Sequence, residues 1–200
     1  MFRKILSDQW TNLNPALQQH YGIRNGEEIS LTGELAVKHG RYIKLLMPLI
    51  RLTGALVPVE GERFEVSVHN KRVDDLFYWH RVFKKDNKIY EFKSKMQQFD
   101  NDIVEFVGLG IGIRMGLKVK KGALIYEDKG YVFKLGSFLI PIPLGLLMGV
   151  SNIEEFKSED SSNDINMRFV VNHPWFGFGF SYMGYFNKKE ITNVPSDKCL

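Results

Sequence analysis

The sequence predicts an α+β fold that is mainly antiparallel β, with a sheet that is strongly curved or closed into a lipocalin-like barrel. Apolar and polar side chains alternate with a period of two from Phe64 to Phe186, as they do along strands. Turn signals recur about every 8–12 residues, which is typical of up-and-down sheets. We expect one domain over residues 1–187, because 200 residues suffice for one buried core, and a mobile tail over residues 188–200.

The longer helices are predicted before this succession of strands. Residues 2–21 carry apolar side chains at spacings of one, three and four, which indicates an N-terminal amphipathic helix with Pro15 as a candidate break. Glu27–His39 alternates strictly and predicts the first strand, half-buried. The spacing turns helical again over Arg41–Leu56, where Pro48 is expected to kink the helix or split it.

Turns and prolines divide the strands that follow. Asp86-Asn87 predicts the turn of a hairpin, and further turns are expected at Asp100 to Asp102, Lys121-Gly122 and Lys129-Gly130. Phe138–Met148 breaks the alternation, because its two prolines lack the N–H group that a ladder hydrogen bond needs. We therefore expect an edge strand or a connection there, followed by one helical turn.

The closing stretch, Asn166 to Phe186, holds the densest aromatic alternation in the sequence. In a strand its alternate aromatic side chains share one face; they are Phe176, Phe178, Phe180 and Tyr182. Gly177, Gly179 and Ser181 fall on the opposite face. A strand that is bulky on one side and nearly bare on the other must bend sharply or accept a close neighbour.

Charge and cysteine content indicate which binding partners and which cellular compartment to expect. A net charge of +4 and a pI near 9.0 are only mildly basic, so no nucleic acid is expected as a partner. Cys199 is the only cysteine, which excludes an intramolecular disulfide and suits the reducing cytoplasm. The N-terminus reaches polar residues before an apolar segment develops, so it does not predict a secretory signal.

Two apolar stretches bear on membrane contact. Leu45–Val59 is interrupted by prolines and an arginine, and Phe138–Val150 is short and contains two prolines. Both are shorter than the ~20 residues that a membrane-spanning helix needs. No transmembrane segment is therefore expected, while either stretch is apolar enough for peripheral contact with a membrane.

Four sequence features resemble those of a known family. They are His39-Gly40 followed by a Leu-rich helix that ends at Val57-Pro58, the WHRVF run at Trp79–Phe83, the IPIP element at Ile140–Pro143 and the closing YMGYF at Tyr182–Phe186. In these features the chain is similar to a group of bacterial proteins catalogued as a domain of unknown function. Members occur as single-domain chains or fused behind a saccharopine-dehydrogenase-like module or a membrane region. The resemblance extends to Asn187 and implies a stand-alone domain, but no activity.

No residue constellation specifies a reaction. The histidines at 39, 69, 80 and 173 lack the spacing of a metal site, so we expect no metal and interpret them as surface or structural residues. The GLGIG run at Gly108–Gly112 is superficially similar to a phosphate loop, but a strand pattern follows it where such a loop needs a helix. We therefore expect no cofactor and leave the catalytic residues unassigned.

Arginine interrupts otherwise apolar strands at Arg81, and also at Arg114 and Arg168. If Arg81 points to the apolar face, its charge needs a carboxylate, from Glu91, Glu105 or an acidic ligand. The alternative is that the guanidinium reaches solvent at a strand end.

The predicted curvature of the sheet, and the strand faces that carry glycine in place of larger side chains, lead to a hypothesis about function. Glycines at 112, 116, 177 and 179 thin one face of two strands, which favours a sharp coil or room for a guest molecule. The leading hypothesis is a barrel that binds a hydrophobic small molecule of lipid or isoprenoid type, with Leu45–Leu56 and Leu139–Met148 as apolar rims at its mouth. The predicted ligand-binding residues are Trp79, Arg81, Met115, Phe176, Phe178, Phe180 and Tyr182.

Two alternatives stay open. In the first, side chains fill the barrel core and the outer surface binds another protein. In the second, the protein is an enzyme that acts on a hydrophobic substrate, with His80, Arg81 or Tyr182 among its polar groups. The enzyme requires His, Arg and Tyr side chains that converge in one pocket.

Overall fold

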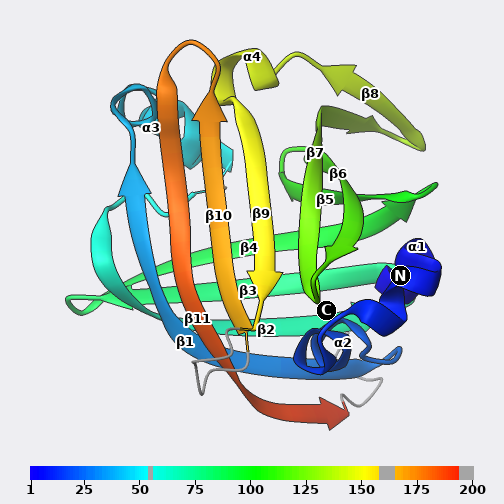
Figure 1. Cartoon of the computed structure of the whole chain (residues 1–200). Coiled ribbons are helices and arrows are strands. Elements are labelled where there is room, and N and C mark those ends of the chain that lie inside the picture. The colour runs from blue at the N-terminus through cyan, green and yellow to red at the C-terminus, as the bar shows by residue number, and fades with distance from the viewer. Residues whose placement is uncertain (54–55, 158–164, 194–200) are drawn as a thin grey trace.

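The computed structural model describes residues 1–53, 56–157 and 165–193 (Figure 1). Within them, ten strands form a closed antiparallel barrel, an eleventh strand lies outside it, and short helices lie at its two ends. The helices are α1 (Phe2–Leu6), the 3₁₀ helix η1 (Ser7–Asn12), α2 (Pro15–Tyr21), α3 (Arg41–Thr53) and α4 (Gly145–Met148). The strands are β1 (Glu27–His39), β2 (Gly61–Val73), β3 (Leu76–Lys85), β4 (Lys88–Phe99), β5 (Asp102–Gly108), β6 (Ile111–Lys120), β7 (Ala123–Leu135), β8 (Phe138–Ile142), β9 (Val150–Phe156), β10 (Ile165–His173) and β11 (Gly177–Asn193).

The barrel closes through β7. Neighbouring strands follow the order β6-β5-β4-β3-β2-β1-β11-β10-β9-β7, and β7 pairs back onto β6. On its other side β7 has two successive neighbours, because Leu124–Glu127 pairs with β9 and Tyr131–Leu135 pairs with β8. Above the short pairing with β9, the two strands separate and β8 turns outward (Figure 1).

The elements predicted before residue 57 and around the prolines are largely confirmed. Residues 2–21 form α1, η1 and α2, and the Asn14 side chain caps α2 by accepting a hydrogen bond from the Ala16 N–H at 3.0 Å. α3 continues through Pro48 and is not split there; residues 54–55, in its predicted extension, lie outside the described residues. β8 is the expected edge strand, and α4 is the helical turn after it. No helix in the described part of the chain is long and apolar enough to span a bilayer.

One predicted turn is wrong. Lys129-Gly130 lies inside β7, which is continuous, and the register between β6 and β7 shifts between Ile113 and Met115. The glycine therefore marks a β-bulge, where its φ of +92° disfavours other residues. The hairpin turn between β5 and β6 instead lies at Leu109-Gly110, inside the GLGIG run, and both of these residues have positive φ.

The four aromatic side chains predicted on one face of the last strand do not share it. The pairing of β10 with β11 skips Gly179, so a bulge resets the alternation at this position. Phe180 and Tyr182 point into the barrel and are buried, whereas Phe178 is 41% exposed. Phe176 lies in the turn before β11 and is 61% exposed.

The glycines of β6 do not make room inside the barrel. Gly112 and Gly116 alternate with inward-facing residues and so face outward. A Cβ at Gly112 would meet the side chains of Val104 and Phe106, which form a small separate cluster with Val132 outside the barrel. The prediction that these glycines make room for a guest molecule is therefore wrong for β6.

β11 is longer than predicted. It continues to Asn193 and pairs with β1 over the whole of Glu27–His39. Residues 188–193, expected as the start of the tail, thus belong to a strand, and residues 194–200 lie outside the described part of the chain.

The N-terminal helices cover the end of the barrel opposite α3 and α4 (Figure 1). Phe2, Leu6 and Leu17 are buried there against the strands. The Tyr21 ring lies 4.1 Å from that of Phe2 and 6.0 Å from that of Phe77, measured between centroids. This end is therefore packed with side chains.

Two glycines allow β1 and β11 to bend together. Gly33 pairs with Phe186, and Leu35 pairs with Gly184, so the glycines are diagonal neighbours. A Cβ at Gly33 would overlap the Tyr185 carbonyl, and one at Gly184 would overlap the Glu34 carbonyl. Backbone atoms cannot move aside as a flexible side chain does, so both positions need glycine.

We expect Gly33→Ala and Gly184→Ala each to lower the free energy of unfolding by about 2 kcal/mol or more, because the added methyl group strains two paired strands. Urea unfolding followed by circular dichroism measures the change. Gly116→Ala is the control, since a Cβ there would meet the flexible ends of the Lys129 and Glu127 side chains and no backbone atom. Equal losses in all three variants would contradict the close backbone approach.

Candidate functional site: an apolar cavity inside the barrel

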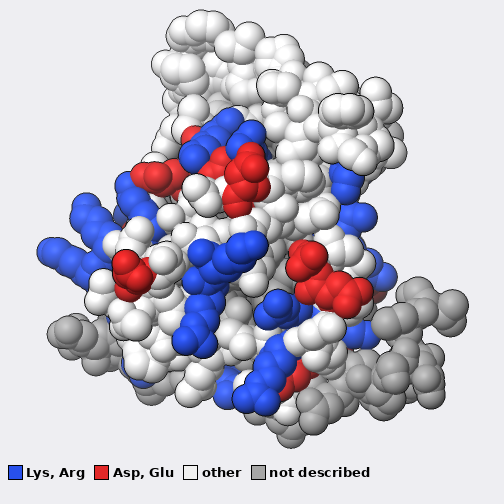
Figure 2. Space-filling view, turned by 90° about the vertical axis from the view of Figure 1, so that its right-hand side faces the viewer, with Lys and Arg blue, Asp and Glu red and all other residues white. Residues whose placement is uncertain are grey.

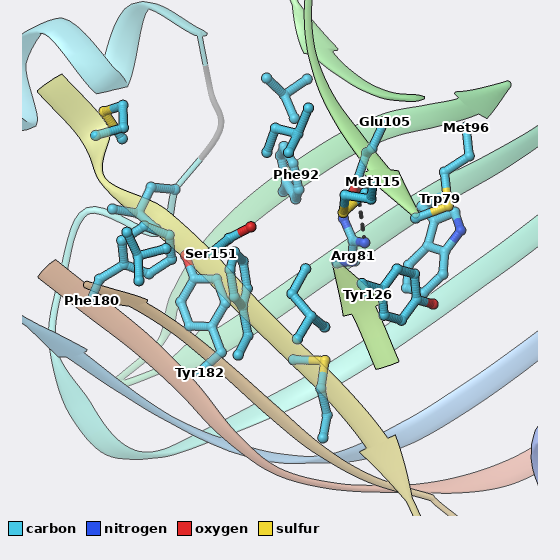
Figure 3. A pocket seen from close by; sticks show the side chains of 18 of the residues that line it. Trp79, Arg81, Phe92, Met96, Glu105, Met115, Tyr126, Ser151, Phe180 and Tyr182 are labelled. Atoms are coloured by element: carbon cyan, nitrogen blue, oxygen red, sulfur yellow. Dashed lines mark hydrogen bonds and ion pairs between the residues drawn. The ribbon is translucent and has the colours of Figure 1, made fainter. Parts of the chain in front are cut away.

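The barrel encloses a cavity of about 350 Å³ (Figure 3). Alternate side chains from each of the ten barrel strands line it, together with residues from α3 and α4. On β1 these are Leu31 and Leu35, and on β6 they are Ile111, Ile113 and Met115. Aliphatic and aromatic side chains make up most of the wall, so the cavity suits an apolar occupant.

The mouth of the cavity lies between α3, α4 and the turn from β5 to β6. Leu46 and Ile50 of α3 and Leu147 of α4 line this end. Leu49 and Leu109 also line the cavity and yet are 54% and 71% exposed, which marks the opening. α3 overlaps the first of the two apolar stretches predicted as rims, Leu45–Leu56, and α4 lies within the second, Leu139–Met148.

Five of the seven predicted ligand-binding residues line this cavity. They are Trp79, Arg81, Met115, Phe180 and Tyr182. Phe176 and Phe178 lie outside it, because the bulge at Gly179 separates them from the inner face. Arg114 points to the outer surface, where it donates to Asp102 at 2.7 Å, and Arg168 is exposed.

Arg81 carries a positive charge at the inner end of the cavity. Its Nη1 and Nη2 donate to Oε1 of Glu105 at 3.2 and 3.1 Å, and Ser94 donates to the same oxygen at 2.6 Å. The Trp79 ring centroid lies 4.1 Å from the guanidinium carbon, a cation–π distance. Glu105 is thus the carboxylate that an inward Arg81 requires, whereas Glu91 contacts His80.

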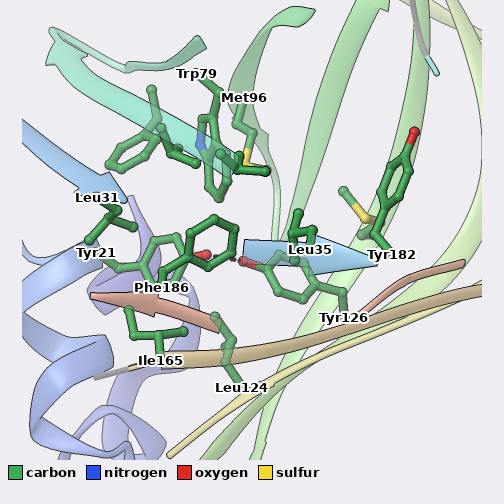
Figure 4. Packing of buried hydrophobic residues seen from close by; sticks show 14 of the residues in the cluster. Tyr21, Leu31, Leu35, Trp79, Met96, Leu124, Tyr126, Ile165, Tyr182 and Phe186 are labelled. Atoms are coloured by element: carbon green, nitrogen blue, oxygen red, sulfur yellow. Dashed lines mark hydrogen bonds between the residues drawn. The ribbon is translucent and has the colours of Figure 1, made fainter. Parts of the chain in front are cut away.

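A second buried carboxylate belongs to Glu155 on β9. Tyr21 donates to its Oε2 at 2.6 Å, and the Tyr126 hydroxyl lies 2.6 Å from that of Tyr21 (Figure 4). Tyr21 has one hydroxyl proton, so Tyr126 donates to Tyr21. Burial raises the pKa of Glu155 to about 7, although the Tyr21 hydrogen bond and the charge of Arg81 oppose the shift.

His20 and Tyr182 are two further polar groups of the cavity wall. Burial lowers the pKa of His20 to about 3, and the nearby Arg81 charge adds to this, so its ring is neutral. Its Nε2 accepts from the Asn70 amide at 3.1 Å. The Tyr182 hydroxyl accepts from the Val57 N–H at 2.9 Å, which ties the segment after α3 to β11. Burial also raises the pKa of Tyr182.

The barrel region of the chain matches a known protein family. The family described as Domain of unknown function (DUF4166) matches residues 13–186. The chain belongs to this family. The match runs from Leu13, two residues before α2, to Phe186 in β11, so the DUF4166 region includes the other nine barrel strands, most of β11 and the polar end of the cavity. No curated protein and no solved structure matches the chain.

Sequence reasoning missed polar residues of this DUF4166 cavity, among them His20, Tyr126 and Glu155, and it missed Tyr21, which contacts Glu155 from outside the lining. A signal was present for Glu155, because it lies two residues after Ile153 in a strand and so shares its face. No local signal connects it to Tyr21, 134 residues away in the chain. Within the described residues, no group of three or more His, Cys, Asp and Glu side chains is arranged to hold a metal ion.

The raised pKa of Glu155 predicts a pH-dependent stability. The folded state keeps this carboxyl protonated between about pH 4.5 and pH 7, where the unfolded chain has released the proton, so stability falls as pH rises through this window. Glu155→Gln removes the loss. We compare the free energy of unfolding of the variant with that of wild type. The difference, variant minus wild type, should be about 3 kcal/mol larger at pH 8 than at pH 4.5.

Urea unfolding of both proteins at the two pH values measures this difference. Glu154→Gln controls for the loss of a carboxylate from the same strand. A Glu155→Gln effect of the same size at both pH values would show that folding does not raise the pKa of this carboxyl.

Proposed function

We propose that this barrel binds a hydrophobic small molecule of lipid or isoprenoid type and makes peripheral contact with a membrane, where such molecules reside. The observation that supports this most strongly is the hollow interior: a cavity of about 350 Å³ with an apolar wall and a mouth at one end. Its size falls within the ~300–1,000 Å³ range of small-molecule sites. A module with a filled core would not need this space.

The position of the predicted residues supports a direct role in binding. Met115, Phe180 and Tyr182 supply apolar wall, and Trp79 and Arg81 lie at the polar end. In this proposal the ligand contacts these five residues, while Phe176 and Phe178 do not touch it. One barrel domain suffices for binding, and the single cysteine favours a reducing compartment such as the cytoplasm.

The charges at the polar end favour a ligand whose own polar group is neutral. Arg81 is already balanced by Glu105, and Glu155 lies in the same part of the wall. A ligand carboxylate entering here would meet two carboxyl groups and an arginine that is already paired. A hydroxyl or carbonyl group needs only hydrogen bonds, so alcohols, ketones or quinone-like isoprenoids suit the site better than fatty acids.

An enzyme that acts on a hydrophobic substrate is the second candidate. His20, Arg81 and Tyr126 line one cavity, which is the convergence that such an enzyme requires, and Glu155 has a pKa near 7, suited to proton transfer. These groups are hydrogen-bonded to protein partners, which supports binding as the first candidate.

We expect a neutral, environment-sensitive apolar dye to fluoresce in the barrel and a long-chain alcohol to displace it. Met167 faces the cavity from β10, so Met167→Trp should fill the space and reduce dye binding at least tenfold. Fluorescence titration measures both. Arg168→Trp, which adds the same ring on the exposed side of the same strand, is the control and should bind normally.

Mass spectrometry of the alcohol after incubation separates the two candidates, because a carrier returns it unchanged and an enzyme returns a product. If wild-type protein neither binds the dye nor co-purifies with a lipid, the ligand proposal is wrong.

Neutralising Glu105 should change the preferred head group. Wild-type protein is expected to bind a long-chain alcohol more tightly than the fatty acid of the same length. Glu105→Gln leaves the Arg81 charge uncompensated, so the ratio of the two Kd values should shift toward the acid by about tenfold or more. Displacement titrations with both ligands give the ratio, and Glu91→Gln, on the outer surface, is the control. An unchanged ratio would place the ligand head away from Arg81.

A further inference from the structure

The end of the barrel that carries the mouth exposes large apolar side chains. Six of them, from α3, β8, α4 and the turn between β10 and β11, are between 54% and 82% exposed; we call them the apolar rim, and they are Leu45, Leu49, Phe138, Leu146, Trp175 and Phe176. These elements lie together at the top of Figure 1. Figure 2 shows the same end without charged side chains on the face in view, while charges cover the part below.

Hydrogen bonds and ring contacts hold the rim elements to one another. The Tyr42 hydroxyl of α3 donates to the Met148 carbonyl of α4 at 3.0 Å, and the Tyr42 ring lies 5.6 Å from that of Phe176. His173 joins the turn to α4, since its Nε2 lies 2.9 Å from the Leu146 carbonyl. Its Nδ1 accepts from the Trp175 N–H at 3.1 Å, so Nε2 carries the proton. These contacts fix α3, α4 and the turn between β10 and β11 relative to one another, so the exposed side chains form one continuous surface.

The charge of the rim segments is of one sign. Residues 41–53, 131–152 and 169–187 contain no Asp or Glu, and their charged residues are Arg41, Lys44, Arg51 and Lys134. Lys44 is paired with Glu60 at 2.5 Å, while Arg41 and Arg51 are exposed on α3. Apolar side chains bordered by arginines, with Glu60 neutralised by its pairing to Lys44, match a surface that has an apolar interior and an anionic boundary.

We propose that the apolar rim docks on an anionic lipid bilayer, with the mouth of the cavity toward the acyl chains. The rim borders the cavity, because Leu49 belongs to both. Docking would therefore place the mouth where an apolar ligand can pass between bilayer and barrel without crossing water. The docking stands on the surface alone, whereas its use in loading the cavity rests on the proposed function.

Trp175 provides a built-in probe of docking. It is 73% exposed, whereas Trp10 and Trp79, the other two tryptophans, are buried. On addition of vesicles that contain phosphatidylglycerol, the emission of wild-type protein should shift to shorter wavelength, and brominated acyl chains should quench it. Trp175→Phe should abolish both signals while the protein still co-sediments with the vesicles.

The variants assign the contact to the rim. Leu45→Ser, Phe138→Ser and Leu146→Ser combined should weaken vesicle partitioning at least tenfold, since three large side chains no longer enter the apolar layer. The matched control combines Tyr78→Ser and Ile191→Ser, exposed residues on β3 and β11 away from the rim. Phosphatidylcholine vesicles and added salt should both weaken binding of wild-type protein.

Four results would overturn the docking: no sedimentation with anionic vesicles, an unquenched Trp175, equal loss in the control variant, or a rim that instead forms a dimer dissociated by the triple variant in light-scattering measurements. Dye binding by the same proteins tests ligand binding separately from docking. The triple rim variant should still bind dye in solution but should no longer bind vesicles. Met167→Trp should still bind vesicles but should no longer bind dye.

Discussion

The cavity exists because a ring of ten strands must pair every strand on both sides. A long curved sheet with few covering helices satisfies its backbone hydrogen bonds by closing on itself, and here the closure depends on the short pairing of β7 with β9. A ring of this width has more interior than its inward side chains fill. The hollow interior is therefore a consequence of strand number and not of small residues on the inner face, since the glycines of β6 face outward.

A dry interior sets strict conditions on the polar groups within it. Arg81 is tolerated because Glu105, Ser94 and the Trp79 ring together replace water around its charge. Glu155 avoids an uncompensated charge in another way: its carboxyl stays protonated up to near neutral pH and accepts a hydrogen bond from the Tyr21 hydroxyl. The polar end is thus balanced within the protein, which leaves the ligand to supply apolar surface and hydrogen bonds in place of charge.

The two ends of the barrel differ because different segments cover them. The N-terminal helices pack Phe2 and Leu17 against one end and close it. At the other end, α3 and α4 are linked through Tyr42 but leave Leu49 both exposed and in contact with the cavity. An occupant therefore has one direction of entry, and the proposed bilayer contact lies at that same end.

The sequence by itself determined the period-two strands, the helices before residue 57, the edge at the prolines and the need of an inward Arg81 for a carboxylate. These follow from neighbours along the chain, because alternation, proline chemistry and the cost of a buried charge are local properties. The tertiary structure alone decided that Gly130 and Gly179 form bulges and that Tyr21 meets Glu155 across 134 residues. Strand register and closure depend on pairings between distant segments, and one skipped residue moves every later side chain to the other face.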